Sequence, residues 1–279
     1  RRGVVAVAGV DTRRLTHLLR ERGAQPAGAA AGDHARDEAA CVEHARGFAG
    51  LVGAGLAGAV SVRSPTPWLQ GHVRWYSDQR PGEAPAGGPH VVVYDFGVKG
   101  SILRHLVDRG CRLTLVPGDT PADAALALRP DGVVLGNGPG DPAPLLAAQA
   151  AIRGLVAARL PILAICLGHQ LLCLAFGAAT YKMKFGHHGA NHPVRERHSG
   201  RVLVTSQNHG FAVDPATLPP ELEVTHASLF DGSLQGVRHR DLPLRTFQGH
   251  PEAGPGPHDA VLLFDAFVAD LAARRADRS

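Results

Sequence analysis

Short apolar runs alternate with helical patterns between residues 90 and 165, which predicts a sheet flanked by helices. The first run, His90–Asp95, is rich in Val, as is typical of a strand buried on both faces. This alternation indicates an α/β fold with an open, twisted, mostly parallel sheet, whose ligands should collect beyond the C-terminal ends of the strands. Further strands are expected at Arg112–Val116, Gly132–Leu135 and Pro161–Ile165, and helices at Ile102–Val107 and Pro144–Ala158.

Later apolar runs are separated by turn residues instead of helices. Antiparallel strands can be joined by short turns, whereas parallel strands need long crossovers. Part of the sheet is therefore expected to be antiparallel. These runs are Val202–Thr205, Leu222–His226, Leu234–Arg238 and Arg245–Gln248.

The N-terminal third of the chain has a different pattern. A helix is expected from Asp11, a plausible N-cap, to Arg20, with Gly23 as a stop signal. The segment Gly55–Gly88 is rich in Pro, Gly, Ser and Ala and is interpreted as a linker. We therefore divide the chain into residues 1–88, the remnant of a smaller N-terminal domain plus a linker, and residues 89–275, the α/β domain.

Composition excludes several classes of protein. Of 279 residues, 44% are hydrophobic and 19% charged, which fits a globular chain, and no apolar stretch is long enough to span a membrane. The net charge of +4 comes from scattered Arg residues, so we expect no nucleic-acid partner. The four cysteines match no zinc or disulfide framework. With neither an initiator Met nor a signal peptide, we expect a cytoplasmic chain that begins inside a longer protein.

The first candidate for chemistry is Cys166, which directly follows the apolar run ending at Ile165, while Gly168 opens a helical pattern. A nucleophile on such a strand-to-helix turn lies at the edge of the sheet and at the N-terminal end of the helix. The helix end favours a thiolate, and the N–H of Leu167 is available to an oxyanion. The alternative is an inert cysteine at the end of a buried strand.

The second candidate is the pair His250 and Glu252. Residues i and i+2 of an extended segment point to the same side, so the carboxylate can orient and polarise the imidazole. A thiol nucleophile needs such a base, and the base needs an orienting group. A chance pairing is the alternative, because the chain has 16 histidines.

The third candidate is the glycine-rich segment Gly136–Pro142, again directly after an apolar run. Glycines at this density let backbone N–H groups approach a ligand. The segment lacks the Gly-Lys-Ser/Thr ending of a phosphate loop, so a second oxyanion N–H fits it better. A plain turn after a strand is the alternative.

Together, these three segments resemble the class I, triad-type glutamine amidotransferases, which have a flavodoxin-like fold. In that family the oxyanion loop, the Cys elbow and a His-x-Glu pair follow one another in this order. From about Val4 to about Leu271, longer runs narrow the resemblance to the small, glutaminase subunits of carbamoyl-phosphate synthetases. These runs are Asp11–Arg13, Val93–Gly97, Lys182–Gly189, Gln207–Asp214, Ser228–Gly232, Gly249–Ala253 and Pro255–Asp259.

The resemblance implies specific roles. Cys166 would attack the side-chain amide carbon of glutamine, His250 would move the protons, and Glu252 would orient His250. The N–H groups of Leu167 and Gly140 would hold the oxyanion. The residues that would bind glutamine are Gly138, Gly140, Leu167, Gln170, Asn208, Gly210 and Phe211.

The resemblance also implies a partner. Ammonia would pass to a large synthetase subunit for carbamoyl phosphate synthesis, which serves arginine and pyrimidine biosynthesis. No cofactor is expected in this chain, because ATP, a metal ion and bicarbonate would belong to the large subunit. The family carries a β-rich domain ahead of the region found here, which helps to dock the large subunit and gives a glutamine contact.

Two residues depart from the family pattern, and two rival functions remain open. Ala164 replaces a Gly two residues before the Cys, and Gly136 stands where Ser is common; both changes are small. His187, His188 and His192 lack partners at metal-ligand spacing, so no metal site is expected.

The rival functions are a non-catalytic assembly or regulatory module with the same fold, and a cysteine peptidase or related hydrolase. The intact Cys166 disfavours the first, and the run from Gln207 disfavours the second.

Overall fold

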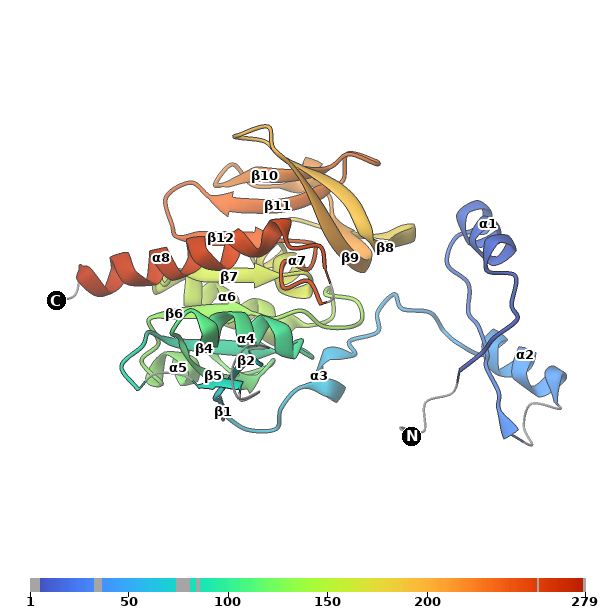
Figure 1. Cartoon of the computed structure of the whole chain (residues 1–279), viewed down its shortest axis with the longest axis horizontal. Coiled ribbons are helices and arrows are strands. Elements are labelled where there is room, and N and C mark those ends of the chain that lie inside the picture. The colour runs from blue at the N-terminus through green and yellow to red at the C-terminus, as the bar shows by residue number, and fades with distance from the viewer. Residues whose placement is uncertain (1–5, 33–36, 74–80, 84–85, 255, 278–279) are drawn as a thin grey trace.

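The computed structural model describes residues 6–32, 37–73, 81–83, 86–254 and 256–277. Within these ranges, ten strands form one sheet in the order β1-β5-β4-β6-β7-β12-β11-β10-β8-β9 (Figure 1). Its middle is parallel, because β4 pairs in parallel with β5 and β6, and β7 pairs in parallel with β6 and β12. The parallel strands are β4 (His90–Asp95), β5 (Arg112–Pro117), β6 (Gly132–Leu135), β7 (Ile162–Ile165) and β12 (Leu244–Phe247).

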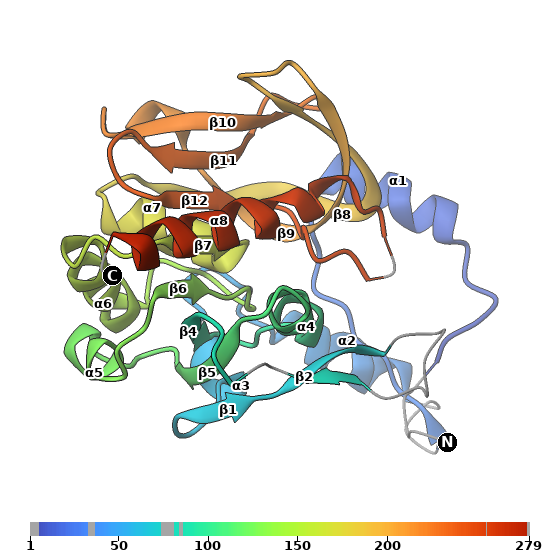
Figure 2. The same ribbon diagram turned by 60° about the vertical axis from the view of Figure 1, so that its left-hand side comes forward.

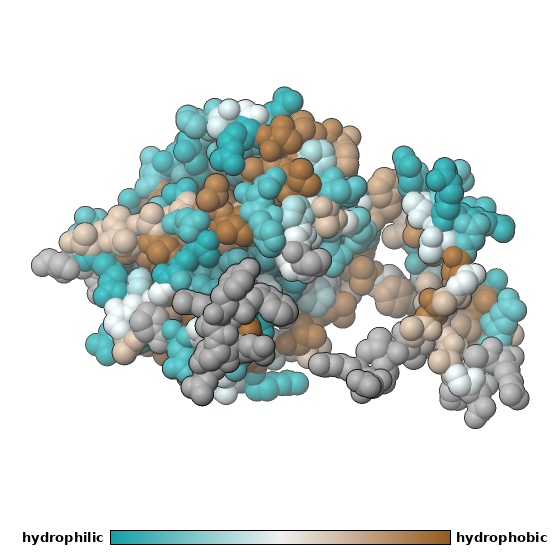
Figure 3. All heavy atoms as spheres, in the orientation of Figure 1, coloured by the Kyte–Doolittle hydropathy of each residue, from teal (hydrophilic) through white to brown (hydrophobic). Residues whose placement is uncertain are grey.

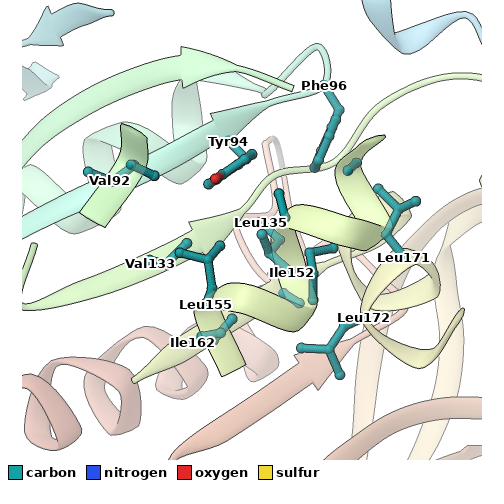
Figure 4. Packing of buried hydrophobic residues seen from close by; sticks show 14 of the residues in the cluster. Val92, Tyr94, Phe96, Val133, Leu135, Ile152, Leu155, Ile162, Leu171 and Leu172 are labelled. Carbon is teal, nitrogen blue, oxygen red and sulfur yellow. The ribbon is translucent and has the colours of Figure 1, made fainter. Parts of the chain in front are cut away.

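Helices cover both faces of the parallel strands, and alternate strand residues point into two separate cores. Val92, Tyr94 and Ile162 face one layer of helices (Figure 4), whereas Val91 and Val93 face the other. The first layer holds α5 (Ala122–Ala127), α6 (Leu146–Ala157) and α7 (Leu167–Ala175). The second layer holds α4 (Gly100–Asp108) and α8 (Leu262–Ala276), as Figure 2 shows.

The remaining strands extend the sheet in the antiparallel sense. On one side they run from β12 through β11 and β10 to a long hairpin of β8 and β9; on the other, β1 pairs with β5. A short 3-10 turn, Pro215–Thr217, follows the hairpin, and a second, Asp259–Val261, precedes α8. These strands are β1 (Thr66–Trp68), β8 (Thr180–Glu196), β9 (Val202–Val213), β10 (Leu222–Ser228) and β11 (Leu234–His239).

The predicted α/β fold is confirmed, with a parallel centre and an antiparallel part. Within the described residues of Gly55–Gly88, which we interpreted as a linker, α3 (Ala57–Val60) is present and β1 joins the large sheet. Two further strands, β2 (Gln70–Val73) and β3 (Pro81–Glu83), pair with each other. The strand β8 was not predicted at all. The division of the chain at residues 88 and 89 stays a prediction.

The first part of the chain packs little against the sheet. The expected helix at Asp11–Arg20 is α1 (Thr12–Arg22), and a second helix, α2 (Glu38–Arg46), follows; neither has a buried residue. The N–H of Ala24 donates to the carbonyl of Lys184, 2.9 Å away, which ties this part to β8. Phe48 in this part is exposed, and Figure 3 shows hydrophobic surface there in brown. In the described part of the chain, no helix is long and apolar enough to cross a membrane.

Candidate active site

Cys166 occupies the predicted turn between β7 and α7. It is the N-cap of α7 and has φ 54° and ψ −105°, a left-handed backbone conformation that is rare for a residue other than glycine. Its own N–H donates to the carbonyl of Phe247 on β12, 2.8 Å away, and the N–H of Gly168 donates to the carbonyl of Gly136, at 3.1 Å. These two bonds hold the strained turn between neighbouring strands.

His250 and Glu252 follow β12, the strand beside β7. The N–H of His250 donates to the carbonyl of Ser206, 2.9 Å away, so β9 fixes the backbone at this point. His250 Nδ1 lies 2.8 Å from Glu252 Oε1, and both side chains are buried. The Cys166 side chain raises the pKa of this ring, so the thiol lies within electrostatic reach of His250. Because Nδ1 faces the carboxylate, Nε2 is the nitrogen left for the thiol. The three side chains therefore form one connected array.

The charges of this array support one another. Burial alone would lower the pKa of His250, but the Cys166 side chain and the carboxylate of Glu252 outweigh it and raise that pKa to about 10. Burial would raise the pKa of Glu252, but His250 and the Lys99 ammonium outweigh it and hold that pKa below its usual value. The site therefore favours the protonated form of His250 beside an ionised Glu252.

Lys99 contacts the site, although the sequence analysis did not select it. Its Nζ lies 2.9 Å from Glu252 Oε1 and donates to the carbonyl of Ala253 at 3.3 Å. Its N–H donates to Asn137 Oδ1, 2.9 Å away, which links the loop after β4 to the glycine-rich loop. The position of Lys99 just beyond a parallel strand was the signal that could have identified it.

The glycine-rich loop lies beside the first residue of α7. Gly140 has φ 92°, and a Cβ at this position would collide with the backbone of Ala54. A Cβ at Gly138 would collide with the backbone of Phe96 and the side chain of Leu167. The loop therefore requires glycine at both positions. Since Leu167 begins α7, its N–H has no acceptor within the helix.

Apart from the two glycines of the glycine-rich loop, the residues expected to bind glutamine lie on α7 and β9. Gln170 is buried, and its Nε2 donates to the carbonyl of Phe211 at 2.8 Å and to Gln248 Oε1 at 3.0 Å. Gln248 is a further residue that we did not predict; its Nε2 lies 3.8 Å from Cys166 Sγ. Asn208 is more exposed, and its Oδ1 lies 2.8 Å from His188 Nδ1.

Gly210 lies two residues along β9 from Asn208, on the strand whose Ser206 pairs with His250. The structure thus brings Gln170, Phe211 and Gln248 into contact. Asn208 and Gly210 lie on the same strand as Phe211, without a hydrogen bond to Cys166.

The histidines near this strand do not form a metal centre. His187 Nε2 lies 2.9 Å from Asp231 Oδ2, and the rings of His192 and His209 lie 4.9 Å and 5.0 Å from that of His187. Among the described residues, no three His, Cys, Asp or Glu side chains are arranged to hold a metal ion. The absence of a cofactor in this chain stays a prediction.

Comparison with known proteins identifies a family. Residues 92–269 match the family described as glutamine amidotransferase class-I. The chain is 57% identical over 267 residues to the carbamoyl phosphate synthase small chain of Thioalkalivibrio sulfidiphilus, a match that covers 95% of this chain and 69% of that protein. It is 56% identical over 275 residues to the small chain of Pseudomonas aeruginosa, covering 98% of this chain and 72% of that protein.

A solved structure supports the fold. The chain resembles a Thermoplasma acidophilum protein assigned as a GMP synthase subunit, with a TM-score of 0.60 and 25% sequence identity. The match covers 70% of this chain and 99% of that protein.

Proposed function

The chain belongs to the carbamoyl phosphate synthase small chains, a family of class I glutamine amidotransferases, and we propose that it hydrolyses glutamine to supply that synthesis with ammonia. One observation carries the residue assignment: His250 Nδ1 lies 2.8 Å from the buried carboxylate of Glu252, and the Cys166 side chain acts on the same ring by raising its pKa. Covalent acyl transfer needs a nucleophilic thiol, an imidazole base beside it and a carboxylate that orients the imidazole, and the three residues supply these groups.

In the proposed reaction, Cys166 attacks the side-chain amide carbon of glutamine as a thiolate. His250 protonates the leaving nitrogen, so ammonia departs and a γ-glutamyl thioester remains on Cys166. His250 then takes a proton from water, which attacks the thioester and releases glutamate. Glu252 keeps His250 in the required tautomer and stabilises its charged form throughout.

Backbone N–H groups carry the second part of the proposal. Those of Leu167 and Gly140 donate to the oxyanion that forms in each tetrahedral intermediate. Gly138, Gln170, Asn208, Gly210 and Phe211 bind glutamine. The contact of Gln170 with the Phe211 carbonyl supports this assignment, since it joins α7 to β9 next to the thiol.

The ammonia then passes to a large synthetase subunit, which uses it to make carbamoyl phosphate for arginine and pyrimidine biosynthesis. We propose that ATP, a metal ion and bicarbonate act on the large subunit, and that this chain needs no cofactor of its own. The cytoplasmic location stays a prediction.

Ammonia release by Cys166→Ser tests the nucleophile. Loss of the thiol should reduce the rate of glutamine hydrolysis by about 10³-fold or more, with or without the large subunit. Cys173→Ser is the matched control, because Cys173 is a buried cysteine on the same helix, with its Sγ 3.9 Å from His169 Nδ1. Wild-type turnover by Cys166→Ser would contradict the nucleophile assignment, whereas no ammonia release by the wild-type chain would support a non-catalytic module with the same fold.

A further inference from the structure

A histidine outside the triad contacts the backbone of Glu252. His105 lies on α4, and its Nε2 is 3.3 Å from the carbonyl oxygen of Glu252, a residue 147 positions further along the chain. A carbonyl oxygen only accepts hydrogen bonds, so Nε2 must carry the proton. His105 on α4 thus donates a hydrogen bond to the backbone of Glu252, the acid of the triad.

The other ring nitrogen fixes the tautomer. Arg109 Nη1 lies 3.3 Å from His105 Nδ1, and a guanidinium group can only donate, so Nδ1 must be an unprotonated acceptor. Arg109 is held in turn by Asp265, whose Oδ1 accepts from Nε at 2.7 Å. Only the neutral ring with a proton on Nε2 satisfies both contacts of His105.

Packing fixes the orientation of the ring. The ring of His105 stacks on Phe264 of α8, with centroids 4.9 Å apart and planes inclined by 19°. The ring of His72, on β2, packs edge-to-face with that of His105, with centroids 4.7 Å apart. His72 is held in turn by Asp108, whose Oδ2 lies 2.6 Å from His72 Nδ1. Two other elements therefore hold the ring on which the contact with Glu252 depends.

The surroundings also keep the ring neutral. Burial, and then His72 and Arg109, lower the pKa of His105, and these effects outweigh the Glu252 carbonyl and Asp108, which act in the opposite direction. A proton on Nδ1 would face the guanidinium of Arg109. The donor to Glu252 therefore has one stable form near neutral pH.

The loop that carries Glu252 needs such support. Ala253 has φ 52°, a left-handed conformation that costs energy for any residue with a Cβ and persists only where surrounding contacts enforce it. Its N–H donates to the carbonyl of His250 at 3.2 Å, and its carbonyl accepts from Lys99. His105 supplies the bond on the Glu252 side of this strained residue.

We propose that His105 is a positioning residue for the triad, which holds the Glu252 backbone so that its carboxylate meets His250. This role rests on the proposed function, because it acts through Glu252 and His250. Since the effect concerns the base and not the glutamine contacts, it alters kcat and leaves the KM for glutamine nearly unchanged.

Two substitutions at His105 separate the donor from the packing. His105→Leu removes the N–H but still fills the space beside Phe264 with a side chain, and kcat should fall roughly 10- to 100-fold. His105→Gln places an N–H near the position of Nε2 and should recover most of that loss. His90→Leu is the matched control: His90 is half-buried and begins β4 at the end away from the site, so kcat should stay close to the wild-type value.

A pH profile supplies a readout that loss of packing would not move. With Glu252 displaced, the imidazolium of His250 is less stabilised and loses its proton at lower pH, so the alkaline limb of kcat should shift downward in His105→Leu. A folded His105→Leu with kcat within roughly twofold of wild type would overturn the proposal. So would equal losses in His105→Leu and His105→Gln, or a change confined to KM. Cys166→Ser, assayed in parallel, distinguishes failure of the His105 proposal from failure of the proposed function, because its activity tests the triad independently of His105.

Discussion

At the scale of single residues, the state of His250 follows from its two neighbours. A neutral imidazole is the usual form of a buried histidine, and burial acts in that direction here. The Cys166 side chain and the carboxylate of Glu252 reverse this preference, and His250 and Lys99 together hold the pKa of Glu252 below its usual value. The protonation of His250 is therefore set by Cys166 and Glu252, and through Glu252 by Lys99.

Substitution of Lys99 tests whether its positive charge lowers the pKa of Glu252. In Lys99→Met, Glu252 loses its ammonium partner, so its pKa should rise and the acid limb of the kcat profile should move to higher pH. We expect kcat to fall roughly tenfold at neutral pH, since one charge-assisted hydrogen bond is lost. Lys99→Arg is the control because it keeps the positive charge. An unchanged acid limb in Lys99→Met would mean that Lys99 does not influence Glu252.

At the scale of elements, the turn between β7 and α7 depends on close contact with β6. A Cβ on Gly168 would collide with the carbonyl of Leu135, so α7 approaches the sheet only because this residue is glycine. The position of α7 in turn fixes Cys166 and the N–H of Leu167. Close packing and the geometry of the nucleophile are therefore linked.

Gly168→Ala should destabilise the chain and displace the turn. We expect the free energy of unfolding to fall by about 1–3 kcal/mol, the usual cost of overpacking, together with a loss of glutamine hydrolysis. Denaturant unfolding measures the first and ammonia release the second. Gly58→Ala serves as the control, because nothing lies within 4 Å of a Cβ built at Gly58 on α3. Equal stability of the two variants would show that the predicted collision is relieved at no cost.

Elements differ in how far the sequence reveals them. The strand β4 is buried almost throughout, so it forms a continuous apolar run and was predicted. The strand β8 is long but polar and contains Gly186, Gly189 and Pro193, and its order comes from pairing with β9. Its propensities gave no signal of a strand, because the stabilising partner is remote in the sequence.

The candidate site shows the same limit. Cys166, His250 and Glu252 were selected because each stands in a local motif. Lys99 and Gln248 stand in none, and their role depends on contacts across the fold: Gln248 is 82 positions from Cys166, and Lys99 is 154 from Ala253. Such contacts follow from the order of the strands, which local patterns do not specify.

At the scale of the whole molecule, two buried histidines beside the site make the stability of the fold depend on pH. His169 and His209 are buried beside the site, and burial lowers the pKa of each to about 3. Both rings are neutral in the folded chain, whereas in the unfolded chain they take up a proton below pH 6.5. Their contribution to stability is complete above pH 6.5 and is lost as the pH falls toward 3.

This linkage predicts acid sensitivity. Each of the two histidines should lower the free energy of unfolding by up to ~1.4 kcal/mol per pH unit below pH 6.5. In His209→Asn, an amide donor can still reach the Phe211 carbonyl, which His209 Nδ1 contacts at 2.7 Å, but the titrating ring is gone. Unfolding measured above pH 6.5 and near pH 5 should show a smaller loss in the variant than in wild type. Identical losses would contradict the assignment of His209 as a buried neutral group.

The covalent intermediate gives the most direct test of the central claim, that the Cys166 thiol attacks glutamine. The complex of this chain with its large subunit would be quenched in acid during turnover, and its peptides mapped by mass spectrometry. The account predicts a γ-glutamyl group on the peptide that contains Cys166, and none in Cys166→Ala, which should also release no ammonia above background. A γ-glutamyl group on another residue, or undiminished ammonia release by Cys166→Ala, would contradict it.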